Sequence, residues 1–264
     1  MNSSPNEVLP LGFLDRLSVF ETMRVVAGRV FFPEKHLERL AESCRVLNEP
    51  LPLPAPELRR WMHAMLRKSG HADATLRISV HWDGAHGGRI VLFIRPFTGH
   101  PRAWYERGIE LSTAVLRRPS PRAQDPQIKA SQYVGGVMAM LDAGGLPAVA
   151  AHELVFFGPG GTVAEGMVSN LFLVKRKSLL TPSVASGILK GVTRGIVIDL
   201  AGKRGWPVLE TELTRHEFYA ADECFLTNTS SEVLPVVRLD GRAIGAGKPG
   251  PWTRMLAEDF KRLR

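Results

Sequence analysis

A proline-rich and charge-rich stretch, "RRPSPRAQDP" from Arg117 to Pro126, limits most strongly how this chain can fold. Three prolines and several charged residues interrupt the apolar periodicity there, and proline fits poorly inside helices and central strands. We therefore expect a smaller N-terminal domain over residues 1–116, a linker over 117–126 and a larger C-terminal domain over 127–264. A chain of 264 residues is long enough to bury the cores of two such domains.

The part before this stretch mixes strand and helix patterns. The segment "LSVFETMRVVAGRVFF" predicts two strands joined at Ala27 and Gly28. Two helices follow: Pro33 opens "PEKHLERLAESCRVLN", which has one apolar face, and Gly70 closes "PELRRWMHAMLRKSG". The segments "ATLRISVHW", "RIVLFIRP" and "GIELSTAVL" are typical of strands. The predicted class of this part is α+β.

The part after the stretch contains more β-structure. Helices are predicted for "SQYVGGVMAMLDAGG", "VTRGIVIDLAGKRG" and "PWTRMLAEDFKRL", and strands for "ELVFF", "PVLETEL", "ECFLTNT" and a pair around "NLFLVKRKSLLTP". The hairpin "VVRLDGRAI" is expected to use its Asp-Gly turn. We therefore predict an α+β fold with two domains, and we expect the active cleft between them because ligands favour domain interfaces.

The composition excludes several classes of protein. Apolar residues make up 44% and charged residues 23%, which is ordinary globular usage, and no apolar run is long enough to span a bilayer. The first residues lack a basic segment followed by an apolar one, and only Cys44 and Cys224 are present, so we expect a cytoplasmic protein. The net charge of +8 comes from scattered arginines, which favours a small anionic ligand over nucleic acid. We expect no metal site.

Lys129 lies in "DPQIKASQY", directly after the proline-rich stretch and among short and apolar residues. A lysine amine held in a dry pocket can form a Schiff base with a carbonyl compound. Tyr133, four residues later, could hydrogen-bond an oxygen of the same ligand. A surface lysine is the commoner outcome for this spacing, so the pattern alone leaves both interpretations open.

Glu165 lies in "GGTVAEGMVSNLF", between apolar segments and beside Gly166, which lets a backbone or a flat ring approach closely. A carboxylate buried there needs a cationic partner, and a protonated pyridine nitrogen would be one. A turn glutamate that faces solvent is an equal alternative.

Three further segments could bind an anion such as phosphate. In "ASGILKGVTRGIV", Gly191 precedes Val192 and Thr193 at the start of a helix, where backbone amides are free to bind an anion. Thr229 and Ser230 follow a strand directly, and Arg39 lies at the edge of an apolar helix face and could supply a guanidinium fork. Simple helix capping, a turn and a solvated helix arginine are the corresponding alternatives.

Together, and in this order, these segments resemble the class IV aminotransferases, the fold-type IV family of pyridoxal-phosphate enzymes. That family includes branched-chain and D-amino-acid aminotransferases and aminodeoxychorismate lyase. The resemblance runs from about Ser18 to Leu256 and rests on six segments: "SVFETMRVVAGRVFFPEKHLERL", "IKASQYVGGVMA", "VAEGMVSNLFLVK", "ILKGVTRG", "ADECFLTNTSSEVLPV" and "DGRAIGAGKPGPWTRML".

The resemblance implies a role for each matching residue and pyridoxal 5′-phosphate as cofactor. Lys129 resembles the Schiff-base lysine, which also moves the proton at the substrate Cα, and Glu165 the carboxylate that pairs with the pyridine nitrogen. Tyr133 matches the residue near the phenolic oxygen of the ring, and Leu189 the apolar residue beneath the ring. The implied phosphate-binding and neighbouring residues are Arg39, Val192 through its N–H, Thr193, Thr229 and Ser230.

The chain departs from the family pattern in places that bear on substrate. Where members of the family carry a "GDGVFE"-like segment, this chain has "DRLSVFE". Arg16, Phe20 and Arg77 are therefore the candidate substrate-binding residues, and Arg89 and Arg95 are further candidates for the substrate carboxylate. The four-residue spacing from Lys129 to Tyr133 and the "TNTSSE" stretch resemble the D-amino-acid and lyase branches more than the branched-chain enzymes, so the chirality of the substrate is left open.

The resemblance favours an aminotransferase that moves an amino group from an amino acid to a 2-keto acid. The alternatives are a 4-amino-4-deoxychorismate lyase, which would release pyruvate, and a binding protein without catalytic activity on the same scaffold. The family also implies a homodimer in which a loop of the neighbouring subunit completes the pocket, and the segment from Asp15 to Ser18 is expected to be that loop.

Overall fold

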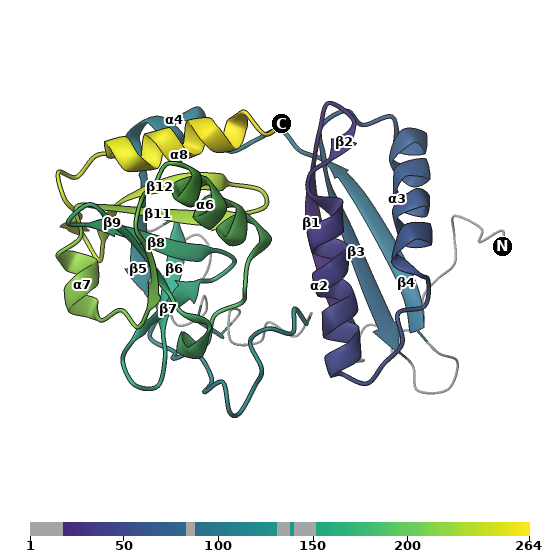
Figure 1. The fold of residues 1–264 in the computed structure, drawn as a ribbon, viewed down its shortest axis with the longest axis horizontal. Helices are drawn as coiled ribbons and strands as arrows, with labels where there is room; N and C mark the ends of the chain where they lie inside the picture. The colour runs from purple at the N-terminus through teal and green to yellow at the C-terminus, as the bar shows by residue number, and fades with distance from the viewer. Residues whose placement is uncertain (1–17, 83–87, 131–137, 140–151) are drawn as a thin grey trace. The chain divides into compact units, whose positions relative to one another are not determined.

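The computed structural model describes residues 18–82, 88–130, 138–139 and 152–264, and the chain divides into two compact units (Figure 1). The first unit is Met1–Pro96 with Ile128–Gln132, and the second is Phe97–Gln127 with Tyr133–Arg264. The division at Pro96 lies before the predicted linker at 117–126. The reason is β5 (Ile109–Thr113), which pairs with strands of the second unit.

The first unit contains a four-stranded antiparallel sheet in the order β2-β1-β3-β4. Its strands are β1 (Ser18–Val26), β2 (Arg29–Val30), β3 (Ala74–Trp82) and β4 (Gly88–Pro96). The predicted turn joins β1 to β2: Ala27 and Gly28 both have positive φ, which matches a tight hairpin. The two strands predicted from "LSVFETMRVVAGRVFF" are thus confirmed.

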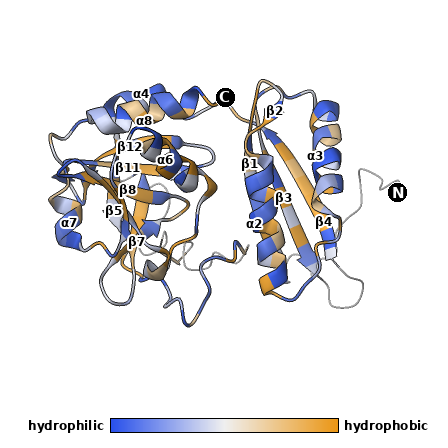
Figure 2. Cartoon of the chain, viewed as in Figure 1, coloured by the Kyte–Doolittle hydropathy of each residue, from blue (hydrophilic) through white to orange (hydrophobic). Residues whose placement is uncertain are grey.

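Two helices pack on this sheet, α2 (Pro33–Val46) on β1 and α3 (Ala55–Ser69) on α2 and β4. Proline opens α2 and left-handed Gly70 closes α3, as the sequence predicts. The visible side of α2 is mostly hydrophilic, whereas hydrophobic residues lie on the strands behind it (Figure 2). The core of this unit takes residues from both helices and the sheet, including Met23, Leu40, Met62, Leu76 and Ile78.

The second unit contains a nine-stranded mixed sheet in the order β10-β9-β8-β11-β12-β5-β6-β7, with β13 paired to β12. β7 also approaches β8 and β9, so the sheet curls toward itself. The strands other than β5 are β6 (Glu153–Phe157), β7 (Val163–Gly166), β8 (Asn170–Lys175), β9 (Ser178–Pro182), β10 (Val208–Thr211), β11 (Glu223–Asn228), β12 (Glu232–Leu239) and β13 (Arg242–Ala243).

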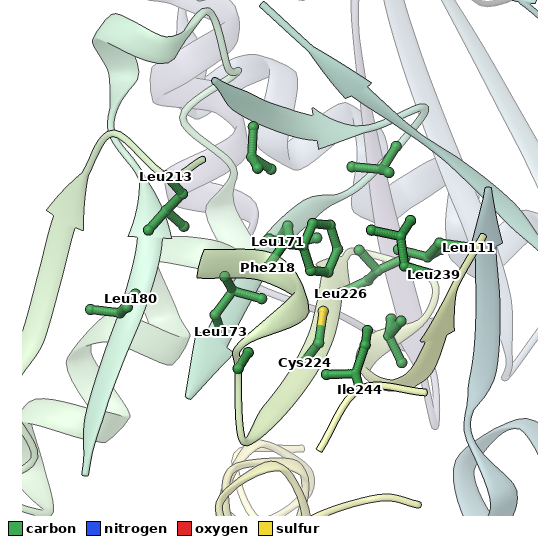
Figure 3. Packing of buried hydrophobic residues seen from close by; sticks show 14 of the residues in the cluster. Leu111, Leu171, Leu173, Leu180, Leu213, Phe218, Cys224, Leu226, Leu239 and Ile244 are labelled. Carbon is green, nitrogen blue, oxygen red and sulfur yellow. The ribbon is translucent and has the colours of Figure 1, made fainter. Parts of the chain in front are cut away.

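Helices of the second unit surround this sheet: α4 (Arg102–Arg107), the 3₁₀ turn η1 (Val184–Ser186), α6 (Val192–Lys203), α7 (Arg215–Tyr219) and α8 (Pro251–Lys261). The largest buried cluster packs between strands and α7. Figure 3 shows the ring of Phe218 at its centre, with Leu171, Leu226 and Leu239 pointing toward it. Such a core leaves strand ends and their loops as the places where functional side chains are exposed.

Most predicted elements are present at the predicted places. The expected strand "GIELSTAVL" is shorter, and α4, β7 and α7 were not predicted. The helix expected for "SQYVGGVMAMLDAGG" lies largely outside the described residues. Among the described residues, no helix has the length and apolar character needed to cross a bilayer.

Candidate active site

Six of the predicted cofactor residues lie in the second unit, and Lys129 and Arg39 lie in the first. The substrate candidates Phe20 and Arg77 are also in the first unit. Tyr133 and Arg16 lie outside the described residues. The six residues of the second unit are Glu165, Leu189, Val192, Thr193, Thr229 and Ser230.

The backbone around Lys129 is bound to strand β1. The N–H of Phe20 donates to the carbonyl oxygen of Lys129 at 2.9 Å, and Val19 and Ala130 form an antiparallel bridge. Ile128 packs against the core of the first unit. The residues before and after Lys129 are therefore both fixed: Ile128 packs on the core, and Ala130 pairs with β1. This holds although the segment follows a proline-rich loop.

Phe20 contacts two cations. The Nζ of Lys129 lies 4.6 Å from the centroid of its ring, and the guanidinium carbon of Arg77 lies 3.6 Å from the same centroid. Arg77 comes from β3, which pairs with β1 in antiparallel register. Cation–π attraction of this kind orients both side chains, and more strongly where water is excluded. Phe20 is buried, so the surrounding side chains hold its ring in place against the amine of Lys129.

Arg39 is held by Glu21, which the sequence analysis did not identify. The Nε and Nη2 of Arg39 donate to the two carboxylate oxygens of Glu21 at 2.7 and 2.8 Å, and His36 Nδ1 lies 2.7 Å from the same carboxylate. Burial raises the pKa of Glu21, but Arg39 and His36 outweigh burial and hold this pKa at about 2. The signal in the sequence was a glutamate within the apolar strand "SVFETMRVV".

Glu165 is buried on β7 and is contacted by three groups of its own unit. Arg118 Nη2 forms an ion pair with Oε1, while Asn170 Nδ2 and the N–H of Leu189 donate to Oε2 at 3.1 and 3.0 Å. Gly166, the next residue, has no room for a Cβ, which would overlap Ser169 Oγ and the carboxyl group of Glu153. Glu165 is therefore a buried acid and not a turn residue that faces solvent.

Asn170, at the start of β8, connects Glu165 to the loop that leads into α6. Its Nδ2 donates both to Glu165 and to the carbonyl oxygen of Leu189, the second at 2.8 Å. Its Oδ1 lies against Gly191, where any Cβ would overlap it. Asn170 thus fixes the predicted ring-contacting residue Leu189 relative to Glu165. The sequence analysis quoted Asn170 within a motif but gave it no role.

The N-terminus of α6 has no side-chain cap. Gly191 is the N-cap residue with φ −66° and ψ 140°, and as a glycine it provides no side-chain cap to the first-turn amides. Val192 and Thr193 are the first two helical residues, and Thr193 is buried. Amides without a partner in the helix, together with the helix dipole, favour an anion at this position.

The turn after β11 contains Thr229 and Ser230 and is organised by Asn228. The Oδ1 of Asn228 accepts the N–H groups of Ser230 and Ser231 at 2.9 and 2.6 Å. The amide of Ser230, a predicted donor to a ligand, is therefore engaged within the turn in this structure. The hydroxyl of Thr227 is buried and has no hydrogen-bond partner among the described residues.

The residues of the second unit fit a ligand that has a cationic ring nitrogen and an anionic phosphate. Glu165 is a buried carboxylate, α6 offers uncapped amides, and the buried hydroxyls of Thr227 and Ser186 have no partner among the described residues. A buried polar atom without a partner is costly unless a ligand or water satisfies it. Pyridoxal phosphate has groups that complement each of these features. Among the described residues, no cluster of histidine, cysteine, aspartate or glutamate could hold a metal ion.

Comparison with known proteins decides the family. Residues 18–239 match the family model of class IV aminotransferases. The chain belongs to the class IV aminotransferase family. A branched-chain-amino-acid aminotransferase of Pseudomonas aeruginosa is 29% identical over 262 residues, which is 95% of this chain and 83% of that protein.

Solved structures support the same assignment. The branched-chain amino acid aminotransferase of Escherichia coli superposes with a TM-score of 0.87 at 27% identity, over 93% of this chain and 85% of that one. The enzyme from Thermoproteus uzoniensis, determined with norvaline, gives a TM-score of 0.84 at 30% identity, over 93% of this chain and 84% of that one. The α+β fold-type IV prediction is thereby confirmed.

As a class IV aminotransferase, the chain is a pyridoxal-phosphate-dependent transaminase. These relatives and solved structures are aminotransferases by name, so the comparisons favour transamination over the lyase reaction. The predicted enzyme class is confirmed.

Proposed function

We propose that this transaminase transfers the amino group of branched-chain aliphatic amino acids to a 2-oxo acid, with pyridoxal 5′-phosphate as its cofactor. The observation that carries the proposal is Glu165, a buried carboxylate linked through Asn170 and Leu189 to the uncapped N-terminus of α6. This arrangement offers an acid for a ring nitrogen and amides for a phosphate within one unit of the chain. The names of the relatives support the choice of substrate.

Each predicted cofactor residue has a proposed contact. In the second unit, Glu165 would receive the ring nitrogen, Leu189 would contact the ring, and the amides of Val192 and Thr193 would bind the phosphate. Thr229 and Ser230 would complete the phosphate end. In the first unit, Arg39 would bind the phosphate and Lys129 would attach the cofactor covalently. Tyr133 would contact the ring oxygen.

The bound cofactor supplies an electron sink for the bond broken at the substrate Cα. The remaining steps belong to the residues of the chain. The amine of Lys129 would take the proton from the substrate Cα and deliver it to C4′ of the cofactor. Glu165 keeps the proton on the ring nitrogen because a carboxylate stabilises the cationic form. The contact between Phe20 and Lys129 holds the amine in a fixed direction.

Phe20, Arg16 and Arg77 are the proposed substrate contacts. The ring of Phe20 would pack against an aliphatic side chain, which gains about 0.8 kcal/mol per buried methylene. An arginine guanidinium matches a carboxylate with two parallel hydrogen bonds. The guanidinium of Arg77 lies over the ring of Phe20. Phe20 would therefore contact the apolar side chain of the substrate, and Arg77 would bind its carboxylate.

We also propose a homodimer located in the cytoplasm. The family resemblance supports the dimer, with the segment around Asp15 completing the pocket of the neighbouring subunit. Both cysteines are buried and free, which fits a reducing compartment. Sedimentation at micromolar concentration together with an activity assay tests the dimer: a fully active monomer would exclude it.

The substrate proposal is tested with purified protein, pyridoxal phosphate and a panel of amino acids with a 2-oxo acid acceptor. We expect leucine, isoleucine and valine to be converted faster than alanine or aspartate, with each enantiomer assayed separately. Activity that requires an acidic or aromatic amino acid would contradict the branched-chain assignment. Release of pyruvate from 4-amino-4-deoxychorismate without any acceptor would restore the lyase alternative.

A further inference from the structure

Arg118 contacts Glu165, but neither the sequence analysis nor the proposed function gives it a role. Its Nη2 forms an ion pair with Glu165 Oε1, and the exposed fractions of the two side chains are 23% and 7%. The pair therefore lies mostly out of water, where screening is weak and the attraction is strong. The other oxygen, Oε2, accepts hydrogen bonds from Asn170 Nδ2 and from the N–H of Leu189, which are neutral donors.

The protein holds Arg118 in place by its backbone and by an aromatic ring. Its N–H donates to the carbonyl oxygen of Phe157 at 2.9 Å, and its guanidinium carbon lies 5.2 Å from the centroid of the Phe156 ring. Its Nε is buried and has no hydrogen-bond partner among the described residues. An orphaned Nε indicates that the guanidinium is directed at the carboxylate and is not part of a wider polar network.

We propose that Arg118 is a positioning residue that shares the carboxylate of Glu165 with the ring nitrogen of the cofactor and serves as its counter-ion when the ring is absent. The inference rests on the proposed function, in which Glu165 receives that nitrogen. It assigns Arg118 no contact with substrate. Arg118 acts through Glu165 alone.

The physical reason is the cost of a buried carboxylate without a cation. If one partner of a buried ion pair is removed, the remaining charge is left uncompensated and the fold is destabilised. Arg118 would prevent this in the cofactor-free protein. With the ring bound, two cations share one carboxylate, so the binding of the cofactor depends less on the charge of its nitrogen than it would without Arg118.

The first test is a double-variant cycle on the cofactor-free protein, with Arg118→Met, Glu165→Gln and the combination. Arg118→Met alone is expected to lower the melting temperature by about 4–8 °C, and by clearly less when Glu165 is already glutamine. Arg117→Met is the matched control, because Arg117 is adjacent and exposed and its guanidinium faces the ring of Phe157. If the decreases in melting temperature from Arg118→Met and Glu165→Gln simply add in the double variant, the proposed coupling between Arg118 and Glu165 is overturned.

The second test measures binding of pyridoxal phosphate and of its analogue in which a ring C–H replaces the nitrogen. Wild type should prefer pyridoxal phosphate, and Arg118→Met should increase that preference about tenfold or more, because the analogue then leaves Glu165 without a cation. Arg118→Lys, which keeps the charge, should return the preference to near the wild-type value, and Arg118→Gln replaces the methionine variant if the latter does not fold.

The outcomes separate the two claims. A wild type without preference for the ring nitrogen overturns the proposed role of Glu165, and the shared carboxylate with it. A wild type that does prefer the nitrogen, with the same ratio in Arg118→Met, overturns the role of Arg118 alone. A purely structural Arg118 would change the melting temperature and leave this ratio unchanged.

Discussion

Each unit of the molecule contains a buried glutamate paired with an arginine, but the contacts of the two carboxylates differ. In the first unit, Arg39 grips both oxygens of Glu21 with a fork, and His36 adds a third contact. In the second unit, Arg118 Nη2 forms an ion pair with Oε1 of Glu165, and Asn170 Nδ2 and the N–H of Leu189 donate to Oε2. Glu21 is fully buried, whereas Glu165 retains a small exposed fraction.

The difference indicates which partner performs the function. Glu21 is saturated by protein groups, so its contribution is to fix the direction of Arg39, the proposed phosphate ligand. Glu165 is bound on one side by a cation and on the other by amides, which suits an acid that also receives a ligand cation. In the first unit a glutamate positions an arginine, and in the second unit an arginine positions a glutamate.

Lys129 should show the largest effect, because it is the residue of the first unit that we propose performs chemistry. Lys129→Ala is expected to lower the rate of leucine transamination by about 10⁴-fold or more, since the proton at Cα then has no acceptor. Bound cofactor should persist without a covalent bond, because Arg39, the α6 amides and Thr229 are unchanged. Steady-state rates and dialysis-resistant cofactor content measure the two effects.

Lys190→Ala is the matched control, since Lys190 is exposed and lies one residue after Leu189. It should retain nearly the full rate. A Lys129→Ala enzyme with more than a tenth of the wild-type activity would remove Lys129 from the mechanism.

Glu165→Gln should have the next largest effect and would test the second unit. An amide cannot hold a proton on the ring nitrogen, so we expect kcat to fall about 10²–10³-fold while the cofactor remains bound. The phosphate contacts lie elsewhere, so the Kd of the cofactor should rise only modestly. If kcat is near the wild-type value, Glu165 is a structural residue like Glu21, and the contrast between the units disappears.

Glu21→Gln should act on binding and stability and not on the chemical step. Losing a charge-assisted fork is expected to weaken cofactor binding about tenfold, because Arg39 is no longer aimed, with kcat at saturating cofactor little changed. Equilibrium titration of the cofactor-free protein measures the Kd. A loss confined to kcat would show that Glu21, like Glu165, belongs to the catalytic residues.

The pH dependence of unfolding should separate Glu21 from Glu153, a buried glutamate whose contacts are Ser169 and the backbone N–H of Val168. The pKa of Glu21 is lowered from 4.5 to about 2, so its contribution is present above pH 4.5 and is lost as pH falls toward 2. That contribution is on the order of 3 kcal/mol. The unfolding free energies of wild type and Glu21→Gln should therefore converge in acid.

Glu153 should show the smallest effect, with the opposite sign. Burial raises its pKa, so its contribution is complete below pH 4.5 and is lost as pH rises through the pKa of the folded protein. Relative to wild type, Glu153→Gln should gain stability as pH increases, because the wild-type carboxyl must ionise in a buried place while the amide stays neutral and its oxygen can keep both hydrogen bonds. Denaturant titrations at several pH values test this. If the stability difference from wild type changes with pH in the same way for Glu21→Gln and Glu153→Gln, the contrast between cationic partners at Glu21 and neutral donors at Glu153 is contradicted.

Local patterns predicted the elements but not the contacts that make the site. Helix α2, with Pro33 at its start, and the hairpin at Ala27 and Gly28 follow from periodicity and turn residues, which act within a few positions. The helix α7 was missed although Thr214 and Glu217 form a capping box, because its five residues are too short for a periodic pattern. Short elements depend on such caps alone.

The pairing partners at the site could not be read from the sequence for a different reason. Arg118 and Glu165 are 47 residues apart, and Asn170 and Leu189 are 19 apart, so only the folded sheet brings them together. Local sequence patterns already made Glu165 and the α6 N-terminus candidates, and the resemblance to a family then favoured the functional interpretation of both. Arg118 had no such mark, and it lay in a stretch interpreted as a linker.

The most direct test of the central claim is to locate the covalent attachment of the cofactor. Wild-type protein loaded with pyridoxal phosphate is reduced with borohydride and digested, and the modified peptide is identified by mass spectrometry. The account predicts one modified residue, Lys129, on the segment that is held by strand β1. Modification of Lys190 or of any lysine other than Lys129 would contradict it.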